Sequence, residues 1–469
     1  MQSPVVSTHE LWVGNERQDV EVHAGYLPLA EENGDLLARV FHIAYIAQQP
    51  ADAPPRPVTF VFNGGPGSSS VWLHLGGVGP WRVDMGEDGL DGNAGQTPFT
   101  LAENPHSLLG VSDLVFLDPV STGHSRAARG VDASRFHGLE GDADSVAAAI
   151  RLWTQRNARW DSPKFLCGES YGTARAAALS KVLQRTQGIE LEGIVLISAV
   201  LDFATLRFDP SNDLVYALLL PSFGATAAYH GRIPVDLEKE RDTFLAEVET
   251  FALETYLPAL VLGNRLPEER RVALAERLAG CTGLSAEELL ECNLRPSLSL
   301  FTKSLLRGSR RTVGRLDSRF LGRDRDAAGE SYEYDPSYAA ILGPFTAAQN
   351  HLMTTKLGWS QDLPYEILTG RVRPWTYPEG RYPDVTQDLR ETMARNPHLR
   401  VFVAEGIFDL ATPYFAIRHT LSHLGWEDDM AERFTIRRYD AGHMMYIRPA
   451  DNLQLGTDLA SFYSKALGR

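Results

Sequence analysis

The stretch of residues 164–175 constrains the fold of this chain more than any other. It reads K-F-L-C-G-E-S-Y-G-T-A-R. Residues 165–167 form an apolar run typical of a buried strand, and an alanine-rich helix pattern runs from Thr173 towards Leu183. Residues 168–172 have the G-x-S-x-G spacing of a nucleophile elbow, whose glycines permit a sharp turn that lifts the Ser170 hydroxyl above the sheet edge. The strand before and the helix after give this short motif its weight, because Gly and Ser are common residues.

The strand-then-helix rhythm continues on both sides of this stretch. A helix pattern at 142–153 precedes the elbow strand, and an Asn-Gly turn joins two strand-like runs at 26–29 and 37–46. Short apolar runs predict further strands at 58–62, 114–117 and 193–201, and the strand rhythm returns at 400–404 and again at 434–439. This alternation is typical of a mostly parallel central sheet flanked by helices, so we predict an α/β fold.

The middle of the chain has a different pattern. At 469 residues the chain exceeds one ordinary domain. Residues 204–394 are dominated by amphipathic helix signals and by loops rich in Pro, Tyr and Arg. We predict that they form a largely helical cap, inserted between two parts of the core at 1–203 and 395–469. A basic run at 303–325 inside the insertion has helix-like spacing, which predicts a solvated helix face, with a functional anion site as the alternative.

Charge, hydropathy and cysteine content limit the partners, the cellular location and the disulfide content that we expect of this chain. The formal net charge of −15 argues against nucleic acid or an anionic membrane as the main partner. No apolar run is long enough to span a membrane, so we expect no integral membrane segment. Residues 1–30 lack a signal-type apolar core, so we expect a cytoplasmic protein as numbered, or a secreted or periplasmic one from which a leader was removed. Three cysteines do not make a disulfide framework, and whether Cys281 and Cys292 pair is left open.

The ends of two late strands offer partners for Ser170. A serine hydroxyl needs a base, usually His, and that base needs a carboxylate to fix its tautomer. The strand at 400–404 leads to Asp409 in a turn, and the strand at 434–439 leads to His443 directly after a glycine. Ser, acid, His is the order of these groups along the chain of α/β-hydrolases, and catalytic groups collect beyond the carboxyl ends of parallel strands. The pattern therefore predicts a triad of Ser170, Asp409 and His443.

Other residues compete for the roles of base and acid. His351, His419 and His423 lie inside apparent helices rather than just beyond a strand, which favours His443. Asp440 sits in the same loop as His443, whereas a triad acid normally comes from the preceding strand end, which favours Asp409.

A glycine-rich loop at 63–70 follows the strand at 58–62. It reads N-G-G-P-G-S-S-S and lacks the Lys-Ser/Thr ending of a phosphate-binding loop, so we expect no nucleotide, and we predict neither a cofactor nor a metal. Its paired glycines favour an oxyanion hole, in which backbone N–H groups face a developing negative charge, over a mere tight turn. Asn63 adds a side-chain donor for a carboxylate or a carbonyl.

Together these residues resemble the serine carboxypeptidase family of the α/β-hydrolase superfamily. The family's marks are an N-G-G-P-G-x-S-S loop, a G-E-S-Y-G elbow, a late Asp and a G-H-M near the C-terminus. They are found here at 63–70, 168–172, Asp409 and 442–444. The segments 104–107 and 114–118 and Gly123 are also similar to the family's segment between loop and elbow. The resemblance covers both parts of the predicted core and implies an α/β-hydrolase fold.

The resemblance implies a role for each matching residue. Ser170, Asp409 and His443 would form the triad, and the N–H groups of Gly65 and Tyr171 would form the oxyanion hole. Asn63 and Glu169 would hold the terminal carboxylate of the substrate. Gly64 and Met444 would also bind substrate.

The chain departs from the family's pattern at two positions. Ser68 stands where the family often has Cys, which is consistent with a reducing or bacterial setting. Eukaryotic members place a second carboxyl-binding Glu shortly before a Gly-Pro pair, and counting from Asn63 that position is Gly77. The Glu–Glu pair is therefore absent from this chain.

The activity that the resemblance implies is that of a serine-type carboxypeptidase. Such an enzyme takes a peptide with a free C-terminus and removes its last residues through an acyl-enzyme. Because water or another alcohol can open an acyl-enzyme, an esterase or acyltransferase on the same scaffold is the first alternative. A catalytically silent binding protein, in which Ser170 would be unreactive, is the second. The sequence leaves the oligomeric state open.

Overall fold

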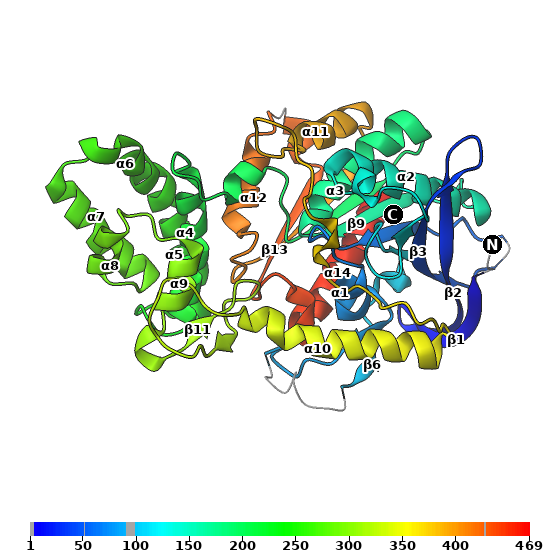
Figure 1. The fold of residues 1–469 in the computed structure, drawn as a ribbon, viewed down its shortest axis with the longest axis horizontal. Coiled ribbons are helices and arrows are strands. Elements are labelled where there is room, and N and C mark those ends of the chain that lie inside the picture. Colours follow the sequence, from blue (N-terminus) through cyan, green and yellow to red (C-terminus); the bar gives the residue numbers. More distant parts are fainter. Residues whose placement is uncertain (1–3, 51, 91–98, 426–427) are drawn as a thin grey trace.

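A computed structural model describes residues 4–50, 52–90, 99–425 and 428–469, and its centre is one large mixed sheet (Figure 1). The strands of this sheet lie in the order β1-β2-β3-β7-β4-β9-β10-β13-β14, and β8 pairs with β3 beside this path. Their bounds are β1 (Val5–Val13), β2 (Glu16–Ala30), β3 (Leu36–Ala47), β4 (Val58–Phe62), β7 (Asp113–Leu117), β8 (Arg126–Ala127), β9 (Lys164–Glu169), β10 (Gly193–Ile197), β13 (Arg400–Gly406) and β14 (Phe434–Tyr439). Two small hairpins lie outside it, β5 (Trp81–Val83) with β6 (Leu101–Glu103) and β11 (Thr312–Val313) with β12 (Leu321–Gly322).

The six neighbouring strands β7, β4, β9, β10, β13 and β14 run parallel to one another. The strands β1, β2 and β3 form an antiparallel edge, and β3 pairs antiparallel with β7. Every residue of β4, β7, β9 and β10 is buried, which is what short apolar strands covered on both faces require. The structure confirms the predicted α/β fold with a mostly parallel sheet. The strand predicted at 193–201 is shorter than expected, because the chain leaves β10 at Ser198, whose φ is 50°.

Helices cover both faces of the sheet. Successive side chains of a strand point to opposite faces, so Phe165 and Cys167 of β9 join one hydrophobic cluster and Leu166 joins the other. The first cluster is closed by α10 and α14, and the second by α2, α3, α11 and α12. These helices span α2 (Leu139–Arg156), α3 (Tyr171–Val182), α10 (Pro336–His351), α11 (Thr386–Arg395), α12 (Tyr414–Ser422) and α14 (Pro449–Ala466). Short helices at α1 (Val71–Leu73) and α13 (Asp428–Ala431) complete the core.

The segment between β10 and β13 builds a helical lobe with a core of its own. In Figure 1 the green helices of this lobe stand to one side of the sheet, and α10 returns along the core. The lobe's helices are α4 (Leu214–Tyr229), α5 (Leu237–Phe251), α6 (Leu257–Leu262), α7 (Glu268–Thr282), α8 (Ala286–Glu291) and α9 (Leu298–Ser304). The division into domains at 203/204 and 394/395 stays a prediction. Cys281 and Cys292 are free thiols, and no helix in the described ranges is both long enough and apolar enough to cross a bilayer.

The basic run at 303–325 is not the solvated helix face that its spacing predicts. The helix α9 ends at Ser304, and the chain continues through a turn into the β11–β12 hairpin. Lys303 and Arg319 are buried and paired with Asp324 and Asp317 at 2.6 Å. Tertiary ion pairs therefore outweigh the local helical pattern here.

Candidate active site

Ser170 sits at the sharp turn between β9 and α3. Its φ of 59° and ψ of −130° lie in a region that non-glycine residues rarely adopt, and its N–H donates to the Ile197 carbonyl at 3.0 Å. The two glycines of the motif allow close packing rather than the left-handed turn itself. A Cβ on Gly168 would lie 2.2 Å from the Gly172 carbonyl oxygen, and one on Gly172 would lie 2.9 Å from the Phe62 carbonyl oxygen. The elbow thus needs Gly168 so that the start of α3 can lie close to β9, and Gly172 so that α3 can approach the end of β4.

His443 and Asp409 meet as the sequence pattern predicts. Asp409 Oδ2 lies 2.7 Å from His443 Nδ1, and both side chains are buried. Asp409 is held in turn by the N–H groups of Ala411 and Thr412 and by the Thr412 hydroxyl. With Nδ1 engaged by the carboxylate, Nε2 of the neutral ring is the nitrogen that can accept a proton. Burial acts to lower the pKa of His443, but the Asp409 charge and hydrogen bond outweigh it and raise the pKa.

The competing residues lie elsewhere. Asp440 forms an ion pair with Arg241 of α5. His351 is the last residue of α10, and His419 belongs to α12 with His423 directly after it. The structure therefore brings Asp409, and not Asp440, to the ring of His443.

Ser170 and His443 line one cavity, of about 600 Å³, which we call the Glu169 cavity. In the described part of the chain Ser170 Oγ makes no hydrogen bond. The N–H groups of Gly65 and Tyr171 also lack an acceptor among the described residues, since Gly65 lies in a loop and Tyr171 opens α3. Two unused donors beside the Ser170 hydroxyl have the chemistry of an oxyanion hole.

Glu169 is a buried carboxyl in the lining of this cavity. Among the described residues, two side chains donate hydrogen bonds to it, and both donate to the same oxygen. Asn63 Nδ2 and the Tyr446 hydroxyl each donate to Oε2 at 2.6 Å. The other oxygen, Oε1, has no partner in the described residues, and the side chain lines the cavity. Because Oε2 already accepts two hydrogen bonds, the proton of a neutral Glu169 belongs on Oε1, where it can be donated to a ligand.

The protonation of Glu169 is set mainly by burial. Burial raises the pKa of Glu169 to about 7, while the positive charge of His443 and the hydrogen bonds from Tyr446 and Asn63 act to lower it. The Asp409 charge adds to the upward shift. The carboxyl is therefore neutral below about pH 7 and charged above it.

Tyr446 is a site residue that sequence reasoning missed. Its ring fills the space in front of Gly76 and Gly77, where a Cβ would lie 2.1 Å and 2.4 Å from Tyr446 carbon atoms. The position of the family's second Glu is thus closed, and the Tyr446 hydroxyl supplies Glu169 with the partner instead. The adjacent glycines at 76–77 were the available signal, because paired glycines mark the close approach of a bulky group.

A buried ion pair holds the loop that carries Asn63. Arg175 of α3 bonds Asp142 of α2 at 2.7 Å and donates a second hydrogen bond to the Asn63 carbonyl. At the other end of the loop, Asp118 accepts hydrogen bonds from the N–H and hydroxyl of Ser70 at 2.9 and 3.0 Å. The loop is therefore fixed from both sides by the core.

The remaining predicted residues also lie at this site. Gly64, Gly65 and Met444 line the Glu169 cavity with Asn63. Tyr171 lines a second cavity of about 520 Å³, which we call the Trp375 cavity. The two cavities share Gly65, Pro66, Ser170, Arg315 and Arg373. Ser170 therefore stands between two neighbouring cavities. The roles of these residues stay predictions.

The insertion contributes to both cavities only through part of its length. Leu316, Tyr332 and Tyr338 line the Glu169 cavity, and Trp375 and Tyr377 line the Trp375 cavity. The helices α5 to α8 contribute no residue to either cavity. The part of the insertion that meets the site is therefore mainly the region 315–377.

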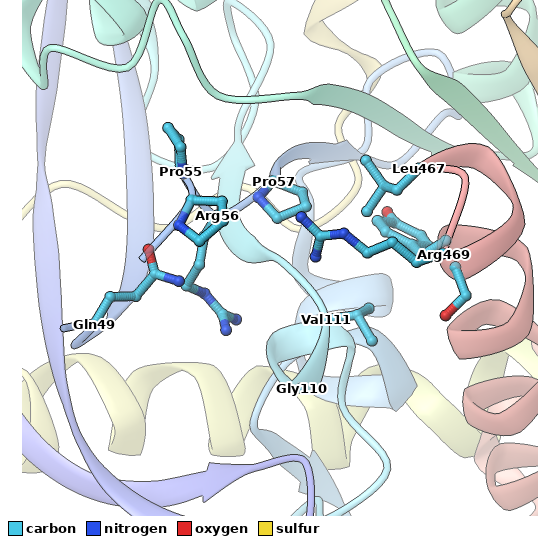
Figure 2. Close-up of a pocket in the computed structure, with 11 residues that line it drawn as sticks. Gln49, Pro55, Arg56, Pro57, Gly110, Val111, Leu467 and Arg469 are labelled. Carbon is cyan, nitrogen blue, oxygen red and sulfur yellow. The ribbon is translucent and has the colours of Figure 1, made fainter. Parts of the chain in front are cut away.

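A further cavity lies away from these residues, at the amino end of β4. It has a volume of about 370 Å³ and is lined by the 54–57 loop and the end of α14 (Figure 2). Arg56 on its wall is paired with Asp113 at 3.0 Å. This cavity shares no residue with the site around Ser170.

The sequence of this chain is similar to those of serine carboxypeptidases over part of its length. The family model described as serine carboxypeptidase matches residues 14–212. Serine carboxypeptidase-like 50 of Arabidopsis thaliana is 28% identical over 233 residues, which are 48% of this chain and 47% of that protein. Serine carboxypeptidase-like 26 of the same plant is 27% identical over 186 residues, 38% of this chain and 37% of that protein. The chain thus spans about half the length, or less, of the curated relatives it matches.

A solved structure extends the likeness of the fold. Kex1(delta)p, a prohormone-processing carboxypeptidase from Saccharomyces cerevisiae, superposes with a TM-score of 0.59 at 16% identity, covering 94% of this chain and 91% of that one. At this identity the match establishes the fold, which is that of the α/β-hydrolases, and nothing finer.

Proposed function

We propose that this chain is a member of the serine carboxypeptidase family, to which its sequence is similar, and that it is a serine-type peptidase that removes residues from the C-termini of peptides. One observation carries the proposal. A buried carboxyl next to Ser170, neutral below about pH 7, presents an unpartnered oxygen to the cavity. A negative charge there would oppose the oxyanion that forms at Ser170, whereas a neutral carboxyl can donate a hydrogen bond to a substrate carboxylate.

The reaction follows from the placement of the groups. His443 Nε2 takes the Ser170 proton while Oγ attacks the carbonyl carbon of the last peptide bond. The N–H groups of Gly65 and Tyr171 stabilise the negative charge that develops on the carbonyl oxygen by donating hydrogen bonds to it. The peptide C–N bond then breaks, and the leaving amine takes the proton from His443. Water opens the resulting ester with His443 again as base, which releases the shortened peptide and regenerates Ser170.

Substrate orientation follows from the two cavities. The C-terminal residue would occupy the Glu169 cavity, where Asn63 and Glu169 face its carboxylate, and the residue before it would occupy the Trp375 cavity. Tyr446 keeps Glu169 in place by its hydrogen bond to Oε2. Tyr446 is a positioning residue in this scheme.

Mass spectrometry of matched peptides tests the proposal. A peptide with a free C-terminus should lose residues from that end only, its C-terminal amide should be a much poorer substrate, and Ser170→Ala should cleave neither. Cleavage of acid and amide at equal rates would replace the proposal by a general hydrolase or acyl-transfer activity. Loss of residues from the amino end, or no labelling of Ser170 by a fluorophosphonate probe, would contradict it outright.

A further inference from the structure

The Trp375 cavity has a composition that the triad and the Glu169 carboxyl do not account for. Three arginine side chains line it: Arg207, Arg315 and Arg373. The described residues on its walls include no Asp or Glu. The whole chain has a net charge of −15, so a cavity lined by arginines alone among the charged residues is opposite in sign to the molecule around it.

Among the described residues, these arginines have no ion-pair or hydrogen-bond partner for their side chains. Other arginines nearby are engaged, such as Arg319 with Asp317 and Arg371 with Glu366. The side chains of Arg207, Arg315 and Arg373 form no ion pair or hydrogen bond within the described part of the chain, and all three are solvent-exposed. Their guanidinium groups are therefore available to an anion entering the cavity.

Two of the three share an aromatic neighbour in the lining of the cavity, Tyr377. Burial raises the pKa of the Tyr377 hydroxyl, and the positive charges of Arg207 and Arg373 act in the opposite direction. The same lining holds Tyr171 and Trp375, whose rings pack edge to face with their centroids 5.2 Å apart. The cavity thus combines an apolar wall with cations near its polar edge.

Its place beside Ser170 decides which part of a substrate it meets. Ser170, Gly65 and Tyr171 belong to its lining, and Tyr171 does not line the Glu169 cavity. With the C-terminal residue in the Glu169 cavity, the side chain of the residue before the cleaved bond enters the Trp375 cavity. A glutamate there can lay its methylene groups on the aromatic wall and reach a guanidinium with its carboxylate.

We propose that the Trp375 cavity selects an acidic side chain, Glu or Asp, on the residue that precedes the cleaved bond, through Arg207 and Arg373. The inference rests on the proposed function, because it assumes that a peptide is cut at its C-terminal residue. Arg315 also lies at the junction of the cavities, but its charge acts on His443 as well, so it is left out of the test.

Two acetylated peptides that differ only by Glu or Gln before a C-terminal leucine test the proposal. At about pH 6 the glutamate side chain is ionised and Gln is its neutral counterpart of the same shape. We expect kcat/KM for the Glu peptide to exceed that for the Gln peptide by roughly tenfold, which is the scale of one charge-assisted hydrogen bond. In the double variant Arg207→Gln/Arg373→Gln this ratio should fall towards one, and added salt should weaken it in the wild type.

Arg151→Gln is the matched control. Arg151 is an exposed arginine of α2 that lines a different cavity and has no partner in the described residues, so its loss should leave the ratio intact. Equal rates for the two peptides in the wild type, or a ratio that survives the double variant, would overturn the inference and leave the proposed function standing. An equal loss for both peptides in the double variant would overturn it too, because the arginines would then bind the terminal carboxylate. If neither peptide is shortened, the proposed function fails together with the inference.

Discussion

The core and the insertion contribute to the site in different ways. Three of the groups that the core brings to the strand ends are buried and hydrogen-bonded: Glu169, Asp409 and His443 are 2%, 0% and 5% exposed. The arginines that the insertion adds, Arg207, Arg315 and Arg373, are exposed and their side chains are unpaired in the described part of the chain. Buried groups have one geometry, whereas exposed ones can be exchanged at little cost to the fold. We therefore expect the core to carry out the chemistry and the insertion to set selectivity.

The largest expected effect comes from the core residues at the strand ends. Ser170→Ala and His443→Ala should each lower kcat/KM by about 10⁴-fold or more, because triad members act as a unit. Asp409→Asn should leave the fold intact and still cripple the rate, since the amide cannot hold the same tautomer of His443. Steady-state kinetics on a free-acid peptide measures all three.

Asp440→Asn is the matched control for Asp409→Asn. Asp440 follows β14 and pairs with Arg241, away from the His443 ring. Its substitution should change kcat/KM little. If Asp440→Asn lowered kcat/KM strongly and Asp409→Asn did not, Asp440 would be the acid of the triad, and the assignment of Asp409 from the geometry would be wrong.

The next largest effect is expected from breaking the buried ion pair between Arg175 and Asp142, which fixes the Asn63 loop. Asp142→Asn leaves the Arg175 guanidinium without its counter-charge in a site where both side chains are almost fully buried. Breaking such a pair costs about 3–5 kcal/mol, so the free energy of unfolding measured with urea should fall by that amount. Lys239→Gln, which breaks an exposed pair with Asp236, should have a small effect. Equal effects of the two would show that the core does not depend on this pair.

The insertion should alter substrate choice without abolishing turnover. Tyr338 lines the Glu169 cavity, and the centroid of its ring lies 6.3 Å from that of Trp72. Tyr338→Ala should lower kcat/KM roughly tenfold for peptides that end in a bulky apolar residue, and less for those ending in alanine. Tyr334→Ala, an exposed neighbour outside both cavities, is the control. A uniform loss over all C-terminal residues would contradict a selective role.

The smallest effect is expected from the hydroxyl of Tyr446. Its hydrogen bond to Oε2 favours the charged form of Glu169, so Tyr446→Phe should raise the pKa of Glu169. The neutral carboxyl would then persist to higher pH, and KM for a free-acid peptide would begin to rise later in a pH series. A purely structural role of Tyr446 would change KM by the same factor at every pH.

The fold could be predicted where the local sequence pattern matches the burial of the element that it forms. The wholly apolar run predicts the strand at Val58–Phe62, and the return of the strand rhythm predicts the strand at Phe434–Tyr439. The two glycines that the close packing requires predict the elbow. Asp409 and His443 could be paired from the sequence because parallel strands end at the same edge of a sheet.

The part that escaped prediction depends on contacts between distant segments. Nothing local in 303–325 shows that Lys303 would pair with Asp324 inside the lobe, so the helix-like spacing was misleading. Tyr446 reaches Glu169 across 277 positions of the chain, and only the glycines at 76–77 hint at the ring that fills their place. The arginines of the Trp375 cavity come from separate loops, whose meeting point no periodicity records.

The central claim is that Glu169 acts as a neutral donor to the terminal carboxylate. Burial raises its pKa to about 7, so the donor is present below that pH and is lost as the pH rises through it. The groups that face it are Asn63 and Tyr446 by hydrogen bonds and His443, Asp409 and Cys167 by charge or proximity. His443 must be neutral to act as base, so kcat should fall on the acidic side while KM changes on the basic side.

The measurement that tests this claim most directly is KM against pH for one peptide and its C-terminal amide, in the wild type and in Glu169→Gln. In the variant the amide oxygen can accept from Asn63 and Tyr446, which leaves the amide N–H₂ facing the cavity as a donor that never ionises. The account predicts that wild-type KM rises above about pH 7 for the free acid only, and that Glu169→Gln flattens this rise. If KM of acid and amide follow the same pH curve in the wild type, Glu169 is not the group that binds the carboxylate.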